Sequence, residues 1–148
     1  GMIEGARAGH PAVAFVGAIG QPDSFAGELP CAYVELVKGT SSTVDELLVW
    51  ARDHIQERAG IPKHIEILPE LPKTAVGKIF KPDLRRLAIA RVYDATFAEA
   101  GIAACVAEVV EDKKLGLVAK LARKGPVDEG AVAHLMGQFA GAWAWVEG

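Results

Sequence analysis

Residues 71–81 of the chain read Leu71-Pro72-Lys73-Thr74-Ala75-Val76-Gly77-Lys78-Ile79-Phe80-Lys81. Pro72 and Gly77 bracket a tight loop, because proline fixes one backbone angle and glycine adopts turn conformations that other residues avoid. Lys78 follows the glycine, so we expect its side chain at the loop tip. A lysine ammonium is a compact point charge that suits phosphate or carboxylate oxygens. Taken alone, the stretch is more typical of a solvated β-turn with surface lysines than of an anion site.

This stretch lies in the basic third of an acidic protein. The 148 residues carry 16 Lys and Arg against 19 Asp and Glu, a net charge of −3, yet residues 58–91 hold eight basic and three acidic side chains. The local excess makes this segment a candidate anion site, with a solvated basic face as the alternative. It is too small and too local to indicate nucleic-acid binding.

Several function classes lack their sequence motifs. A Walker loop needs glycine five positions before its Gly-Lys pair, and Pro72 stands there instead. No dinucleotide-binding glycine pattern, HExxH zinc motif or GxSxG nucleophile elbow occurs. Cys31 and Cys105 make neither a disulfide framework nor a metal box, so we expect no metal site. No apolar run approaches about 18 residues, and no secretory leader is recognised, so we expect a cytoplasmic protein without a membrane span.

The apolar pattern around the loop predicts a small mixed sheet flanked by helices. Thr43 and Glu46 have capping-box spacing, and apolar residues at four-residue intervals extend a helix to Ala59. Gly60 then stops it. Prolines and glycines between Gln21 and Pro30 predict a loop. The expected elements are strands at 13–19, 31–37, 64–68 and 79–80, a helix at 43–59 and the tail of a helix at 3–8. A further helix has Pro82 in its first turn, an apolar stripe from Leu84 to Ala95, and its end at Gly101.

The last third of the sequence predicts a second small unit. Residues 112–116 are typical of a hairpin turn, with a helix over 115–123 as the competing interpretation. Asp128 can cap a helix. The expected elements are strands at 102–111, 117–121 and 143–145 and a helix at 128–139. Together with the short strand at Ile79, the order strand, helix, strand, strand, helix, strand matches the ferredoxin-like pattern. The expected fold class is therefore α+β in both units, with a ferredoxin-like second unit as one candidate.

Six sequence elements in the same order make residues 3–92 resemble the C-terminal lid domain of the adenylate-forming superfamily, which includes acyl-CoA synthetases. The superfamily's last signature is Leu-Pro-Lys-Thr, two residues, Gly-Lys-Ile, one residue, then Arg or Lys, and residues 71–81 match it. The other matching elements are His10-Pro11-Ala12-Val13, Gly20-Gln21-Pro22-Asp23, Gly27-Glu28-Leu29-Pro30, Thr43-Val44-Asp45-Glu46-Leu47 and the turn from Arg58 to Lys63. Residues 93–148 resemble a C-terminal extension and contain no diagnostic motif.

The resemblance implies an AMP-forming acid–thiol ligase. A carboxylate and ATP would give an acyl-adenylate, which CoA would convert to a thioester. Lys78 matches the family lysine that reaches the α-phosphate, and this makes it the catalytic candidate. Lys73, Thr74, Gly77 and Lys81 are candidates for binding nucleotide or CoA. The implied partner is a large N-terminal adenylation domain, in the same chain or a separate subunit. That domain would hold Mg²⁺, and the isolated chain would be inactive and bind no cofactor tightly.

Two alternatives stay open at this point. Gly1 before Met2 resembles a scar left by tag removal, which favours a whole reading frame. The chain would then be a free-standing module that binds nucleotide or CoA, or the small subunit of a split ligase. The extra unit after residue 92 favours fatty or aromatic acids as substrates. Trp143 and Trp145 either cover the core of that unit or form a partner surface.

Overall fold

A computed structural model describes residues 9–146, which divide into two compact units. The first contains the residues up to Gly20 together with Leu29–Leu84, and the second contains Gln21–Glu28 together with the chain from Arg85 onward. The expected helix tail at residues 3–8 lies outside the described residues. No helix in the described range is both long enough and apolar enough to cross a membrane.

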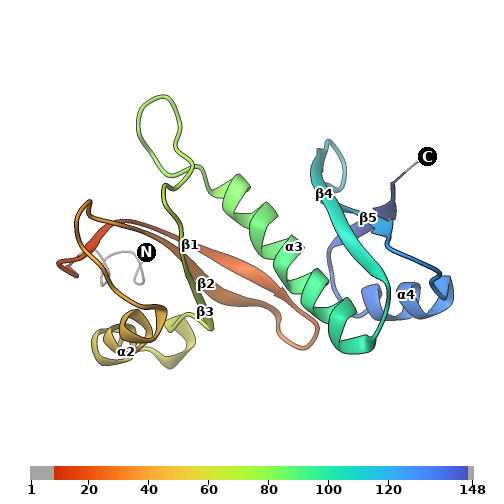
Figure 1. Cartoon of the computed structure of the whole chain (residues 1–148), viewed down its shortest axis with the longest axis horizontal. Helices are drawn as coiled ribbons and strands as arrows, with labels where there is room; N and C mark the ends of the chain where they lie inside the picture. The colour runs from red at the N-terminus through yellow and green to blue at the C-terminus, as the bar shows by residue number, and fades with distance from the viewer. Residues whose placement is uncertain (1–8, 147–148) are drawn as a thin grey trace. The chain divides into compact units, whose positions relative to one another are not determined.

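The first sheet has the order β1-β2-β3, with β1 at Val13–Asp23, β2 at Gly27–Leu36 and β3 at His64–Ile67 (Figure 1). Strands β2 and β3 run parallel, and Cys31 is paired with His64. The predicted strands at 13–19, 31–37 and 64–68 are confirmed. The predicted loop from Gln21 to Pro30 is wrong in length, because β1 and β2 continue into it. The edge position of β1 explains why it tolerates Pro22, which cannot donate a hydrogen bond to a neighbouring strand.

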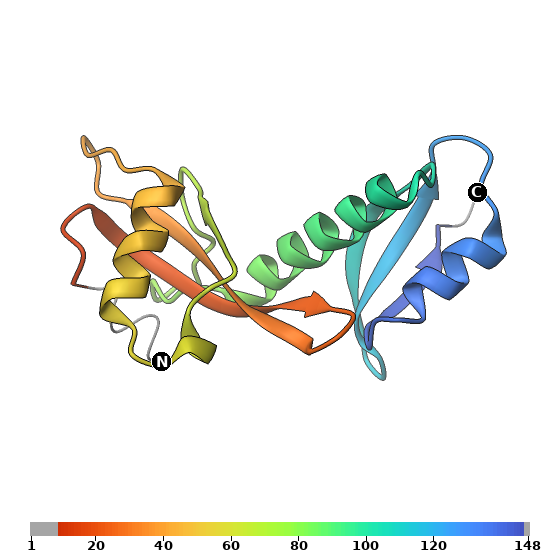
Figure 2. The ribbon, with the colours of Figure 1, turned by 90° about the horizontal axis from the view of Figure 1, so that it is seen from below.

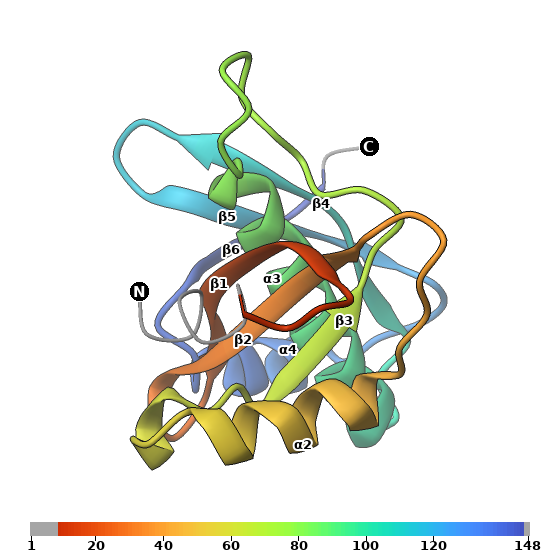
Figure 3. The ribbon, with the colours of Figure 1, turned by 90° about the vertical axis from the view of Figure 1, so that its left-hand side faces the viewer.

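Helix α2, Val44–His54, connects β2 to β3 and covers one face of this sheet (Figure 3). Leu47 packs with residues of all three strands in the core. The buried members of this core cluster are Val13, Ala32, Val34, Leu47 and Ile65. Burying each large apolar side chain of this kind contributes about 1.5–3 kcal/mol.

The start of α2 is confirmed and its predicted end is wrong. The Thr43 hydroxyl accepts a hydrogen bond from the Glu46 backbone N–H at 3.1 Å, as an N-cap does. The helix ends at His54 rather than Ala59, because Ile55 turns into an extended conformation that buries its side chain. The Gly60 stop signal closes only a short 3₁₀ helix, Arg58–Gly60.

Helix α3, Lys81–Ala100, begins beside Pro82 and ends before Gly101 as predicted, but the buried face differs in part from the predicted stripe. Leu84 and Ala88 are fully buried, as expected from the apolar stripe, but Leu87 is 45% exposed. Tyr93 and Phe97 are buried instead, in the core of the second unit. Tyr93 and Phe97 also have the four-residue spacing of one helix face, and this face meets the core in the C-terminal half of the helix.

The second sheet has the order β4-β5-β6, with β4 at Ala104–Asp112, β5 at Gly116–Arg123 and β6 at Ala142–Trp145. Helix α4, Glu129–Met136, runs alongside it (Figure 2). The predicted hairpin is confirmed, and the competing helix over 115–123 is wrong. Asp112 accepts hydrogen bonds from the backbone N–H groups of Lys114 and Leu115 at the hairpin turn. Asp128 caps α4, which ends at Met136 rather than Phe139.

The described residues do not form the four-stranded ferredoxin-like sheet. Ile79 makes only an isolated bridge with Lys73, within the first unit, so the first strand of that pattern is missing. In the ferredoxin-like order, the third and fourth strands would be parallel and separated by the first strand. Here β5 and β6 are parallel and directly paired, with Ala119 opposite Trp143. The second unit is therefore a three-stranded α+β unit.

Candidate functional site

The segment between β3 and α3 forms a short hairpin that projects from the first sheet (Figure 1). Its two arms are joined by backbone hydrogen bonds from Phe80 to the Pro72 carbonyl, 2.8 Å, and from Thr74 to the Lys78 carbonyl, 2.7 Å. The turn closes with a 2.9 Å bond from the Gly77 N–H to the Thr74 carbonyl. This loop is an ordered turn with a defined direction.

Gly77 and Thr74 determine the position of the Lys78 backbone. Gly77 has φ +84°, which L side chains adopt only with strain, so a glycine is required at this position of the turn. The Thr74 hydroxyl accepts a 3.2 Å hydrogen bond from the Lys78 backbone N–H. The Lys78 side chain is exposed, and its ammonium makes no hydrogen bond or ion pair with any residue in the range 9–146. A cation on such a frame can meet an anion that approaches from outside.

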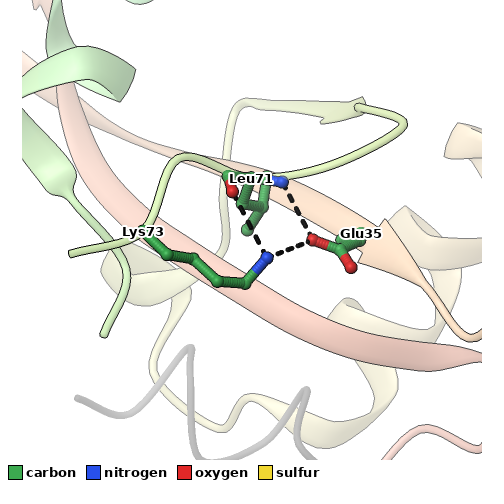
Figure 4. Close-up of polar contacts among 3 residues, drawn as sticks. All are labelled: Glu35, Leu71 and Lys73. Atoms are coloured by element: carbon green, nitrogen blue, oxygen red, sulfur yellow. Dashed lines mark hydrogen bonds and ion pairs between the residues drawn. The ribbon is translucent and has the colours of Figure 1, made fainter. Parts of the chain in front are cut away.

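Lys73, unlike Lys78, has partners within the chain, and Figure 4 shows its contacts with Glu35 and Leu71. Its ammonium donates to Glu35 Oε1 at 2.8 Å and to the Leu71 carbonyl at 3.3 Å. It also lies 4.4 Å above the centre of the Phe15 ring, in a cation–π contact. The Lys73 side chain is only 21% exposed. Lys73 therefore points toward the sheet, whereas Lys78 points to solvent.

Glu35 is ionised at neutral pH and bonds to the loop at two points. One oxygen, Oε1, accepts from both the Leu71 backbone N–H, at 2.9 Å, and Lys73. Burial alone would raise the pKa of the Glu35 carboxyl, but the hydrogen bonds from Lys73 and Leu71 and the charges of Lys73 and Lys38 outweigh it. The pKa therefore lies below its usual 4.5.

The base of the hairpin packs closely against β1. A Cβ on Gly17 would collide with Leu84 Cδ1 and lie 3.1 Å from Ile79 Cγ2. The absence of a side chain at Gly17 thus lets the last residues of the loop and the first turn of α3 approach the strand. Lys81 begins α3 and is partly buried.

The structure brings together only part of the candidate set named from the sequence. Thr74, Gly77 and Lys78 share the turn, Lys73 faces the sheet, and Lys81 stands on the helix. Sequence reasoning missed Glu35 and Gly17, which hold the loop from the strands. A signal for Glu35 was present, because it is the one charged residue in the apolar run Cys31–Val37.

A hollow is lined mainly by residues of α2. Its volume is about 430 Å³. Trp50 stacks on His54 with ring centres 4.0 Å apart and meets His10 edge-on at 5.3 Å. The lining residues are His10, Asp45, Glu46, Val49, Trp50 and Asp53. Among the described residues, no three His, Cys, Asp or Glu side chains gather closely enough to hold a metal ion.

Comparisons with known proteins place this geometry in a family. Residues 2–78 match the model of the AMP-binding enzyme C-terminal domain. The marinolic acid–CoA ligase of Pseudoalteromonas sp. (strain SANK 73390) is 44% identical over 90 residues, which are 61% of this chain and 14% of that protein.

Solved structures of CoA ligases are also similar to this chain. A Brucella canis acyl-CoA synthetase is 33% identical, with TM-score 0.52, over 57% of this chain and 16% of that one. The anthranilate CoA ligase AuaEII in complex with anthranoyl-AMP is 29% identical, with TM-score 0.55, over 62% and 18%. The chain thus spans about a seventh of the length of the curated ligase. The family model covers more than half of the chain, so this chain belongs to the AMP-binding enzyme C-terminal domain family.

Proposed function

We propose that this chain works as the C-terminal domain of an AMP-forming acyl-CoA ligase and that Lys78 is its catalytic residue. The observation that carries the proposal is the ordered hairpin, which presents Lys78 as an exposed cation at a fixed place. The similarity to a ligase solved with anthranoyl-AMP supports an acyl-adenylate as the species that the cation meets.

The proposed reaction has two steps. A carboxylate oxygen attacks the α-phosphorus of ATP, an O–P bond forms, and pyrophosphate leaves with its bonding electron pair. The CoA thiol then gives its proton to solvent, and its sulfur attacks the acyl carbon. A C–S bond forms, the C–O bond to AMP breaks, and AMP leaves with that electron pair. Charge builds on the phosphoryl oxygens during the first step, where a preorganised cation stabilises it. Lys78 supplies that cation in the first step and has no task in the second.

The remaining catalytic parts belong to a large N-terminal adenylation domain, on the same polypeptide or a separate subunit. That domain would bind ATP, Mg²⁺ and the carboxylic acid, and CoA would enter for the second step. The isolated chain is expected to be inactive, because a single lysine on a turn has no substrate pocket. Thr74 and Gly77 would serve by holding Lys78, and Lys81 by adding positive charge near the loop.

The test uses the complete polypeptide encoded by the reading frame that contains this chain. Lys78→Ala is expected to lower adenylation, measured as ATP–pyrophosphate exchange, by about 10²–10³-fold. Thioester formation from preformed acyl-adenylate should be largely spared. Lys113→Ala, an exposed turn lysine in the second unit, is the matched control. Equal loss in both half-reactions would contradict the role of Lys78.

The gene supplies a separate check on the partner domain. An in-frame continuation of several hundred codons upstream, with a Thr/Ser/Gly-rich phosphate loop, supports a single-chain ligase. A stop codon and a ribosome-binding site directly before Met2 would contradict it and point to a separate partner subunit.

A further inference from the structure

We infer that Glu35 is a positioning residue for Lys78, acting through Lys73, and that Lys73 anchors the loop instead of binding phosphate. This inference rests on the proposed function of Lys78. It gives different tasks to two lysines of the signature stretch: Lys73 holds the loop, and Lys78 acts from it.

The contacts of Glu35 bring the first arm of the hairpin onto β2. Oε1 accepts hydrogen bonds from the Leu71 N–H at 2.9 Å and from the Lys73 ammonium at 2.8 Å. The Lys73 ammonium also donates to the Leu71 carbonyl at 3.3 Å. Leu71 is 1% exposed, and the Glu35 side chain is 17% exposed. Solvent therefore competes little with these bonds.

The ammonium of Lys73 is already engaged on the side that faces the sheet. An ammonium has three N–H donors. Two have hydrogen-bond acceptors, on Glu35 and Leu71, and the Phe15 ring face lies 4.4 Å away. For Lys73 to bind phosphate it would have to give up the carboxylate and leave the Glu35 charge partly buried without its partner, which is costly.

The anchor and Lys78 are joined by a short, stiff connection. Lys73 forms the antiparallel bridge with Ile79, and the next bond of the hairpin runs from the Thr74 N–H to the Lys78 carbonyl. A fixed position of Lys73 therefore also fixes Lys78 and Ile79 on the opposite arm. Loss of Glu35 would free this arm while leaving the first sheet and its core intact.

The first experiment follows amide hydrogen exchange in the 148-residue chain. In Glu35→Gln and Lys73→Met, the Thr74 and Phe80 amides should exchange about tenfold faster, which corresponds to the loss of a charge-assisted hydrogen bond. Lys73→Arg keeps a cation that reaches Glu35 and should restore slow exchange. The amide of Ile65, in the core strand β3, should not change. Glu70→Gln, an exposed carboxylate next to the loop, is the matched control.

The second experiment measures adenylation kinetics in the complete polypeptide. Glu35→Gln and Lys73→Met should each lower kcat several-fold with little change in KM for ATP, and the double variant should be no worse than either single variant. If Lys73 instead binds pyrophosphate or ATP directly, another pattern is expected. Lys73→Met would then raise KM for ATP, and its effect would multiply with that of Glu35→Gln. That result would overturn the inference.

The two experiments distinguish failure of this inference from failure of the proposed function. If Lys78→Ala leaves adenylation unchanged, the proposed function fails, and the exchange rates still test whether Glu35 orders the hairpin. If Glu35→Gln leaves the Thr74 and Phe80 amides as slow as in the parent chain, the inference fails even where Lys78 proves essential.

Discussion

Leu84 Cδ1 occupies the space that a side chain on Gly17 would need, so β1 and the first turn of α3 touch at a point where a larger residue would have to displace Leu84. The same glycine lies against Ile79, one residue after Lys78. The second arm of the hairpin therefore depends on β1, as the first depends on β2 through Glu35. The position of the loop is set by strands far from it in sequence.

Gly17→Ala should destabilise the first unit by about 1–3 kcal/mol, as overpacking of a tight contact does. The added methyl group must push Leu84 and Ile79 away from the strand. Urea unfolding monitored by circular dichroism measures the change. Gly125→Ala is a suitable control, because a Cβ there meets only Ala103 at an ordinary 3.7 Å. Equal stability of the Gly17 variant and the parent chain would refute the close packing.

Thr74→Val should release the Lys78 backbone while leaving the global fold intact. The substitution keeps the size of the side chain and removes the hydroxyl that accepts from the Lys78 N–H at 3.2 Å. A net hydrogen bond is worth about 1 kcal/mol, so adenylation by the complete polypeptide should fall about fivefold. Thr74→Ser retains the hydroxyl and should keep most of the activity. A loss of activity in Thr74→Ser as large as in Thr74→Val would rule out this role of the hydroxyl.

Glu35 should make the stability of the chain depend on acid pH. Its folded-state pKa is lowered, so its contribution is fully present above the unfolded value near 4.5 and is lost as the pH falls through the folded pKa. The free energy of unfolding should therefore differ between the parent chain and Glu35→Gln at pH 6, and the difference should shrink below pH 4.5. Comparing the two proteins removes the similar contribution of Asp112, whose pKa is also lowered, by hydrogen bonds from Leu115 and Lys114. A difference that stays constant between pH 6 and pH 3 would contradict the ion pair.

Asp128→Ala should destabilise the second unit by about 0.5–2 kcal/mol through the loss of a helix cap. The Asp128 carboxylate accepts from the Ala131 N–H at 3.2 Å, and α4 carries Val132 and Met136 into the core. Asp128→Ser can still accept this bond and should lose much less. Thermal unfolding of the three proteins gives the comparison, and equal melting temperatures for Ala and Ser would show that the cap contributes nothing.

Local signals in the sequence predicted the parts of the fold that depend on neighbouring residues. Thr43 and Asp128 cap their helices, Gly77 makes the turn that places Lys78, and residues 112–116 form a hairpin turn. Each of these depends on contacts within a few positions of the chain. The resemblance to the adenylate-forming superfamily likewise rested on short ordered motifs, and the family assignment is confirmed.

The expectations that were wrong depend on contacts over long sequence distances. Ile79 was assigned to a strand of the second sheet, but its only bridge is to Lys73 in its own hairpin. The apolar stripe of α3 overlooked Tyr93 and Phe97, because spacing alone does not say which face meets the core. The role of Glu35 was missed, since its partner Lys73 lies 38 positions further along the chain.

The hairpin is closed by bonds among residues 72–80, yet its outermost side chains take no part in them. Val76 is 81% exposed and stands two residues before Lys78. A cysteine introduced there could carry a fluorescent label without disturbing the turn, the carboxylate anchor or the packing at Gly17. The fluorescence of that label would then report the movement of the hairpin that carries Lys78 during turnover, in any larger enzyme to which the chain contributes.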